Sequence, residues 1–299
     1  MKRLLNFTFT ALILAMAGLA NAGERVGDFA LIDHLGGFHQ MSWYDDNSAI
    51  VILSVAIGTE LPKESLTTLT ELQTKYGEQG VVFFGMNPGL QTDRELVKAD
   101  IAETGLNLPV LMDDAQLVSE LLGLTRIGEA VIYDPKNFDL LYRGAIRADM
   151  DRILEQALNG EELNLVSTSS LGQAIDYARS TQTSAVSYLN DVAPIVTENC
   201  ASCHRDGGIA PFAMDSHLTL QGWSPMIKEV VMTKRMPPGQ VDNKVGHAIA
   251  DAMNLTDEEM QKLVHWIDEG SVIDTADDPL AALIWPESKW ERGEPDFIV

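Results

Sequence analysis

The sequence is poor in cysteine and in positive charge. Only two of its 299 residues are cysteine, and both lie in the short segment ENCASCHRDGG, residues 198–208. Lysine and arginine together number 21 against 44 acidic residues, which gives a formal net charge of −23. Because nucleic-acid binding needs clustered basic side chains, nucleic acid is not an expected partner. The excess of acidic side chains instead favours encounters with basic partners.

Long apolar runs are absent after residue 22, which excludes a later membrane-spanning helix. Residues 1–22 combine the basic Lys2 and Arg3, an apolar middle, and the small residues Ala20 and Ala22. This pattern predicts a secretory signal peptide that is cleaved after Ala22, with an uncleaved anchor as the alternative. No cysteine lies near the cleavage site, so a lipoprotein is excluded. The mature protein is expected in the bacterial periplasm, without a membrane span.

The two cysteines form the pattern C-x-x-C-H, with Cys200, Cys203 and His204. A dithiol redox motif would follow the first strand of a βαβ unit, whereas this motif follows a helical segment near residue 190. A zinc site needs four ligands, and a second pair of ligands at zinc spacing is missing from the sequence. Covalent attachment of one haem needs this pattern, because two thiols one helical turn apart can each add to a vinyl group on the same porphyrin edge. A plain disulfide is the remaining alternative.

In this interpretation the residue after the second cysteine directs its imidazole at the iron, so His204 is the expected proximal ligand. Met236 is the expected distal ligand, because Pro237 and Pro238 end any helix and hold the chain extended there. A histidine and methionine pair fills both axial positions, which favours electron transfer over ligand binding. The other downstream candidates are Met214, His217, Met226, Met232 and His247, of which Met226 and Met232 have the helical spacing of core residues.

Residues 23–160 alternate between strand and helix patterns. The runs AIVILSVA (49–56) and VVFFGM (81–86) predict two buried strands, with a helix between them that carries an apolar stripe. Capping boxes predict helix starts at Thr92 and at Thr256. Residues 130–133 and 140–143 predict a hairpin. This order of elements is that of an α/β thioredoxin-like fold, whereas residues 187–270 are expected to be mostly α-helical.

The segments VGDFALIDHLGGFHQMSWY, PVLMDDAQLVSELLGLTRIGEAVIYD and YRGAIRAD resemble the redoxin family over residues 23–172. Leu61 stands where redoxins carry a reactive cysteine, Gly128 where they carry a cis proline, and Gln173 where many relatives carry a further cysteine. The thiolate is the nucleophile in this chemistry and has no substitute, so we expect a redox-inactive docking scaffold. His34 and His39 are expected to be ordinary surface histidines.

The segments DVAPIVTENCASCHRDGGIAPF, KEVVMTKRMPPG, LTDEEMQKLVHWIDEG and WERGEPDFIV resemble bacterial proteins in which a redoxin domain precedes a c-type cytochrome domain. The expected domains are a signal peptide at 1–22, a thioredoxin-like domain at 23–165, a linker at 166–186, and a monohaem cytochrome c domain with a C-terminal extension at 187–299. Relatives commonly place Trp and His where this chain has Gly239 and Gln240.

In longer relatives the GEPD segment leads into a copper-dependent monooxygenase-like domain. The resemblance therefore implies a copper monooxygenase-like protein as one candidate partner. Two alternatives stay open for the chain itself: a stand-alone form whose partner is encoded separately, or a truncated version of a longer enzyme.

Three functions are compatible with these patterns. The leading hypothesis is a periplasmic monohaem c-type cytochrome that passes single electrons to a protein partner, with the thioredoxin-like domain as docking scaffold. The second is a haem enzyme or sensor that binds peroxide or a diatomic gas at an open iron site. The third is a haem-containing interaction subunit of a monooxygenase or oxidase assembly. A carrier is expected rather than an enzyme.

Overall fold

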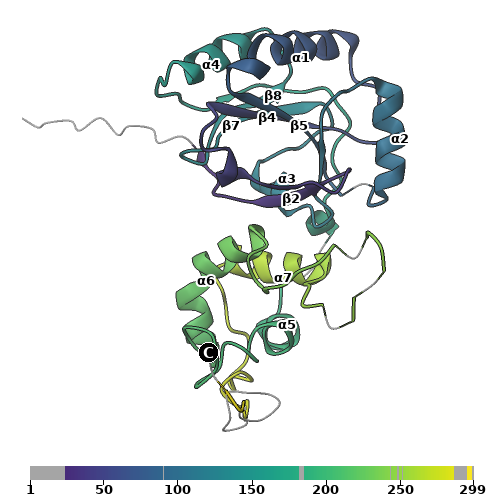
Figure 1. Cartoon of the computed structure of the whole chain (residues 1–299). Helices are drawn as coiled ribbons and strands as arrows, with labels where there is room; N and C mark the ends of the chain where they lie inside the picture. The colour runs from purple at the N-terminus through teal and green to yellow at the C-terminus, as the bar shows by residue number, and fades with distance from the viewer. Residues whose placement is uncertain are drawn as a thin grey trace, which may run out of the picture.

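The computed structural model describes residues 24–89, 91–181, 185–242, 244–247, 249–250, 252–285 and 295–297. The expected signal peptide and most of the segment WERGEPDFIV lie outside these residues. The described chain forms a sheet domain and a helical domain that pack against each other (Figure 1). No helix in this described part has the length and apolarity that a bilayer crossing requires.

The first domain is built on one mixed sheet of nine strands, in the order β1-β8-β7-β4-β5-β6-β2-β3, with β9 paired to β8. At its centre β4 (Ala49–Ser54) and β5 (Val81–Asn87) run parallel to each other. Their continuous apolar sequences follow from burial on both faces of the sheet. The remaining strands are β1 (Glu24–Arg25), β2 (Ala30–Asp33), β3 (Phe38–Gln40), β6 (Val110–Met112), β7 (Glu129–Asp134), β8 (Asp139–Ala145) and β9 (Val166–Ser167).

The connections between these strands are those of the thioredoxin fold, so the predicted fold class is confirmed. Helix α1 connects the parallel strands β4 and β5, the antiparallel hairpin β7–β8 extends the sheet beside β4, and α4 follows the hairpin. Helices α1, α2 and α4 contribute to a buried core on one face of the sheet. The helices of this domain are α1 (Lys63–Tyr76), α2 (Arg94–Thr104), α3 (Leu117–Leu121) and α4 (Asp149–Leu158), with short 3-10 turns at Met41–Tyr44, Gly77–Gln79 and Ala178–Thr181.

The start of α2 differs by one residue from the predicted capping box at Thr92. The carboxylate of Asp93 accepts the backbone N–H groups of Glu95 and Leu96, at 2.9 and 3.4 Å. Because this side chain satisfies two of the free amides of the first turn, the cap lies at Asp93 and the helix begins at Arg94.

The segment after α4 stays attached to the sheet domain. Strand β9 pairs with β8, within the segment that the sequence pattern predicts as a linker. Further along, the amide of Ile127 donates to the carbonyl of Gln173 at 2.8 Å, and the amide of Ile175 donates to Thr125 at 2.9 Å. The ordered scaffold therefore extends to about residue 177, where the Tyr177 hydroxyl donates to the Leu124 carbonyl at 2.7 Å.

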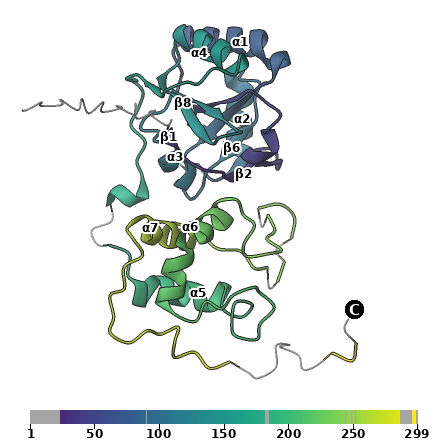
Figure 2. The ribbon, with the colours of Figure 1, turned by 90° about the vertical axis from the view of Figure 1, so that its left-hand side faces the viewer.

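The second domain is mostly helical, as predicted, and Figure 2 shows its helices grouped on one side of the sheet domain. Helix α7 begins with the predicted capping box, in which Thr256 and Glu259 each bond to the backbone of the other. Tyr188 stacks on Trp266 with ring centroids 5.8 Å apart, which joins the first and last helical segments. These elements are the π-helical turn η4 (Tyr188–Val192), α5 (Ala193–Asn199), α6 (His217–Met232) and α7 (Asp257–Asp268).

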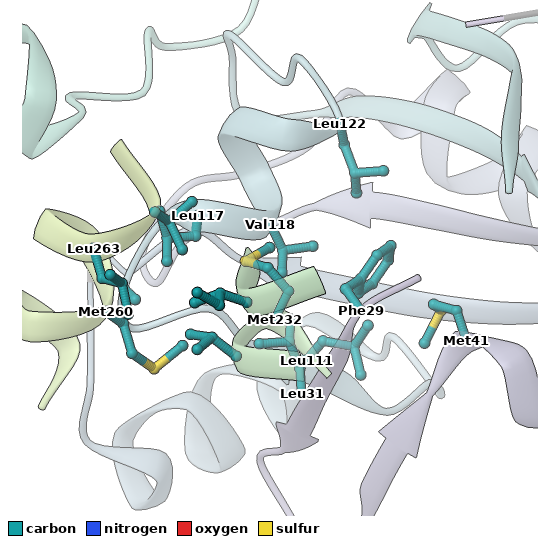
Figure 3. Close-up of a cluster of buried hydrophobic side chains, with 14 of the residues drawn as sticks. Phe29, Leu31, Met41, Leu111, Leu117, Val118, Leu122, Met232, Met260 and Leu263 are labelled. Atoms are coloured by element: carbon teal, nitrogen blue, oxygen red, sulfur yellow. The ribbon is translucent and has the colours of Figure 1, made fainter. Parts of the chain in front are cut away.

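One cluster of buried apolar side chains crosses the boundary between the domains. Figure 3 shows Met232, Met260 and Leu263 of the helical domain beside Leu117 and Val118 of the sheet domain. Two polar contacts lie beside it: His265 donates through Nε2 to the Glu120 carboxylate at 2.9 Å, and Gln261 donates to the Ala115 carbonyl at 2.7 Å. The two domains therefore share a continuous core, which no sequence pattern indicates.

Candidate functional site

The C-x-x-C-H motif forms a single tight turn at the end of α5. The carbonyl of Cys200 accepts the amide of Cys203 at 3.2 Å and that of His204 at 2.9 Å, the spacing of one helical turn. Gly207 follows with a φ of 66°, a left-handed conformation that favours glycine. The chain can therefore reverse soon after the histidine, and both thiols and the imidazole belong to one turn.

Both cysteines and His204 line the same pocket, whose volume is about 360 Å³. The rest of its wall is almost entirely apolar and comes from all three helices and the loops between them; it includes Ile209, Phe212, Ile227, Val230, Val231 and Leu263. A pocket of this size with an apolar wall and few polar groups suits a flat, largely apolar cofactor.

His204 is buried, with 8% of its surface exposed, and its ring is oriented by one hydrogen bond. Its Nδ1 lies 3.0 Å from the carbonyl oxygen of Phe212. A carbonyl oxygen only accepts, so Nδ1 carries a proton and Nε2 is the nitrogen left to bind a metal. The Phe212 ring supports the imidazole at a centroid distance of 4.8 Å and stacks in turn on Trp223 at 4.6 Å. The imidazole is thus in the tautomer that a metal ligand requires.

The two cysteines are free thiols and are not joined in a disulfide. Burial, with smaller contributions from the neighbouring Cys203 and Glu259, raises the pKa of the Cys200 thiol to about 12. Reactive dithiol motifs instead lower the pKa of the attacking cysteine. Across the described ranges there is no group of three or more His, Cys, Asp or Glu side chains that could hold a metal ion, so the zinc alternative has no ligand set there.

Four methionines line the pocket: Met214, Met226, Met236 and Met253. Met214 lies on the histidine side, because its amide donates to the His204 carbonyl at 2.7 Å. Met226 lies on α6 and is exposed, so the prediction that it is a core residue is wrong: helical spacing identifies a face but not what covers it. Met236 is 39% exposed, and its chain bends at residues 236–239 rather than running extended as predicted. Met253 is not marked by any sequence pattern.

The other predicted distal candidates lie away from the pocket wall. Met232 is buried in the apolar cluster between the domains, as its helical spacing indicates. The ring of His217 donates through Nε2 to the carbonyl of Ser271 at 2.7 Å, which holds it at the start of α6. His247 is exposed on the loop between α6 and α7.

The two positions that the redoxin resemblance singles out, Leu61 and Gly128, lie together in the sheet domain. Pro62 occupies the N-cap position of α1, and Leu61 directly before it lies against Gly128, where a Cβ would be 3.2 Å from the leucine methyl carbon. The two positions that would carry the cysteine and the cis proline are therefore spatial neighbours. They hold a leucine and a glycine, which offer neither a nucleophile nor a proton donor.

His34 and His39 are not surface histidines, contrary to the prediction. His34 is buried, and its Nδ1 accepts the amide of Val110 at 3.0 Å. The ring of His39 lies between the Asp33 carboxylate at 2.9 Å and the Tyr44 hydroxyl at 2.6 Å. Both are part of the scaffold, because His34 is bonded to β6 and His39 to Asp33 and Tyr44.

Comparison with known proteins separates the two domains. Residues 190–271 match the family model of cytochrome c. An uncharacterized conserved protein from Geobacillus kaustophilus is 22% identical over 55% of this chain and 93% of its own, with a TM-score of 0.45. A thioredoxin family protein from Chlorobium tepidum is 19% identical over 46% of this chain and 97% of its own, with a TM-score of 0.39. No curated protein matches the chain.

A third structure, the exposed lipoprotein thioredoxin of Streptococcus pneumoniae, is 22% identical over 44% of this chain and 99% of its own, with a TM-score of 0.36. The expected combination of a thioredoxin-like domain with a cytochrome c domain is confirmed. The cytochrome c match implies covalent haem c. Two free thiols, a histidine with a free Nε2 and an apolar pocket fit that group.

Proposed function

We propose that this protein is a periplasmic monohaem c-type cytochrome that carries single electrons between protein partners. The observation that supports it most is the convergence of Cys200, Cys203 and a His204 ring oriented through Nδ1 on one apolar pocket. The signal-type pattern of residues 1–22 supports export, and c-type haem is attached outside the cytoplasm.

Within this proposal each residue has a defined task. When bound, the haem supplies an iron centre that changes its charge by one electron. Cys200 and Cys203 would hold the porphyrin edge covalently, and His204 would offer Nε2 while the Phe212 carbonyl keeps the ring oriented. Met236 would offer its thioether as the second ligand, and the apolar wall would keep water out of the pocket. Burial of this kind, together with a His and Met pair, raises the reduction potential.

The thioredoxin-like domain is redox-inactive in this proposal. Every cysteine of the chain lies in the C-x-x-C-H motif, so the thiolate that thioredoxin chemistry requires has no source in this domain. The net charge of −23 favours a basic redox partner, whose encounter would be fastest at low ionic strength. A copper monooxygenase-like protein is a proposed acceptor or donor on the resemblance alone.

The optical spectrum of the exported haem protein, with and without carbon monoxide, tests this proposal. We expect a low-spin spectrum with a methionine-to-iron charge-transfer band and no response to the gas. Met236→Ala should remove the band and open the iron to carbon monoxide, whereas Met253→Leu, a control in the same pocket, should not. A wild-type protein that binds carbon monoxide readily would instead favour a haem enzyme or sensor. A silent Met236→Ala would show that another residue is the ligand.

A further inference from the structure

The loop that carries Met236 reaches across to the thioredoxin-like domain. This loop lies between α6 and α7 and is described at residues 233–242, 244–247, 249–250 and 252–255. It forms two ion pairs there: Asp242 with Arg94, and Lys244 with Asp114. Lys244 also donates to the backbone carbonyl of Thr92 at 3.4 Å. Arg94 is the first residue of α2, Thr92 lies just before the helix, and Asp114 follows β6, so both pairs anchor the loop to the sheet domain.

Each ion pair has one partner that is largely buried. The side chains of Arg94 and Asp114 are only 11% and 12% exposed, whereas those of Asp242 and Lys244 are 23% and 39% exposed. Although burial alone would raise it, the hydrogen bond from Arg94 lowers the pKa of Asp242. Exposed pairs contribute little, whereas removing one partner of a desolvated pair leaves a charge without compensation. The anchoring of the loop is therefore expected to be sensitive to single substitutions.

The anchored end of the loop is connected to Met236 by hydrogen bonds within the loop. Val241, beside Asp242, forms two bonds with the Asn254 side chain, at 3.0 and 2.7 Å, which join the outgoing and returning limbs. Gln240 donates to the carbonyls of Lys234 at 3.2 Å and Pro237 at 3.0 Å, which closes the turn around Met236. A displacement at Asp242 would thus be transmitted to the pocket wall.

We propose that Arg94 and Asp114 of the thioredoxin-like domain are positioning residues for the distal ligand of the cytochrome domain. They hold the described part of this loop so that Met236 stays at the pocket wall. This proposal rests on the proposed role of Met236. In this proposal the thioredoxin-like domain has a function that needs no cysteine, because it holds the distal-ligand loop of the cytochrome domain in place.

The test compares the wild-type haem protein with Arg94→Gln, Asp114→Asn and the double variant. Arg143→Gln is the control, because Arg143 has a side chain that is 24% exposed and forms an ion pair with Glu24, at 3.1 Å, within the sheet domain alone. Two measurements are made: hydrogen exchange of residues 236–247, and the fraction of protein that binds carbon monoxide. In the double variant, the amides of this segment should exchange faster, and the fraction of protein that binds carbon monoxide should be about tenfold higher. The control should match the wild type in both measurements.

Exchange of charges provides a rescue that a general loss of stability would not show. Arg94→Glu combined with Asp242→Lys should recover the slow exchange and the closed iron site that Arg94→Glu alone loses. If the double variant loosens the loop but leaves carbon monoxide binding unchanged, or does not loosen the loop, the positioning role is overturned. If Met236→Ala does not change carbon monoxide binding, both the proposed ligand and this positioning role are rejected. If Met236→Ala increases carbon monoxide binding but the double variant does not, only the positioning role is rejected.

Discussion

One backbone carbonyl decides which nitrogen of His204 faces the haem pocket. The sequence predicts this histidine, because the C-x-x-C-H spacing is a local feature. It does not predict that the Phe212 carbonyl, eight residues later, accepts the Nδ1 proton at 3.0 Å. That contact depends on how the chain reverses after Gly207, and many loop sequences would permit other reversals.

A buried carboxyl group near the domain boundary provides a prediction at the scale of a single residue. Asp113 accepts the amides of Ser119 and Val118, at 2.6 and 3.3 Å. Burial nevertheless raises the pKa of Asp113 from 3.8 to about 6. Because the folded state holds this proton more tightly than the unfolded state, Asp113 lowers stability as the pH rises through this interval.

Replacing this carboxyl group should therefore change the pH dependence of stability. The free energy of unfolding of Asp113→Asn minus that of wild type should become larger by about 2 kcal/mol as the pH rises from about 4 to about 7. Urea titrations at the two pH values measure this difference, with the exposed Asp46→Asn as control. An equal pH dependence in wild type and Asp113→Asn would contradict the assignment.

At the scale of elements, local patterns predict much of the secondary structure and little of what each element packs against. The capping box at Thr256 and the β7–β8 hairpin are confirmed because neighbouring residues determine them. The residues around Gly172 are polar and lack periodicity, yet they bond to the sheet domain through their backbone. Backbone pairing of this kind does not depend on side chains, so the pattern of side chains does not predict it. In the same way, the spacing of Met226 indicates a helix face but not its environment.

Two glycines in contrasting surroundings should respond in opposite ways to substitution by alanine. A Cβ at Gly172 would collide with the carbonyl oxygen of Ile127, whereas a Cβ at Gly222, on the exposed side of α6, would meet no atom. Gly172→Ala should destabilise the protein by about 2 kcal/mol or more, and Gly222→Ala should stabilise it by about 0.5–1 kcal/mol through the helix backbone. Urea unfolding compares them. A neutral Gly172→Ala would mean that this segment is not fixed to the sheet domain.

At the scale of the whole molecule, the shared core makes the stability of one domain depend on the other. The cluster in Figure 3 contains side chains from β2, β6 and α3 on one side and from α6 and α7 on the other. A linker between independent domains would let each unfold separately. Buried apolar contacts across the boundary instead give the two domains a common free energy of unfolding, in addition to the ion pairs that hold the Met236 loop.

Removing one side chain from this boundary should therefore weaken both domains together. Met232 belongs to the helical domain and is almost fully buried, so Met232→Ala should cost about 2–4 kcal/mol. Native-state hydrogen exchange in increasing urea can follow amides of β5 and of α7 separately. We expect both sets to lose protection by the same free energy, as they should for Leu72→Ala, a core substitution in the sheet domain alone. If Met232→Ala weakened only α7 while β5 kept its full protection, the two domains would be independent units, and the boundary contacts would contribute nothing to their common stability.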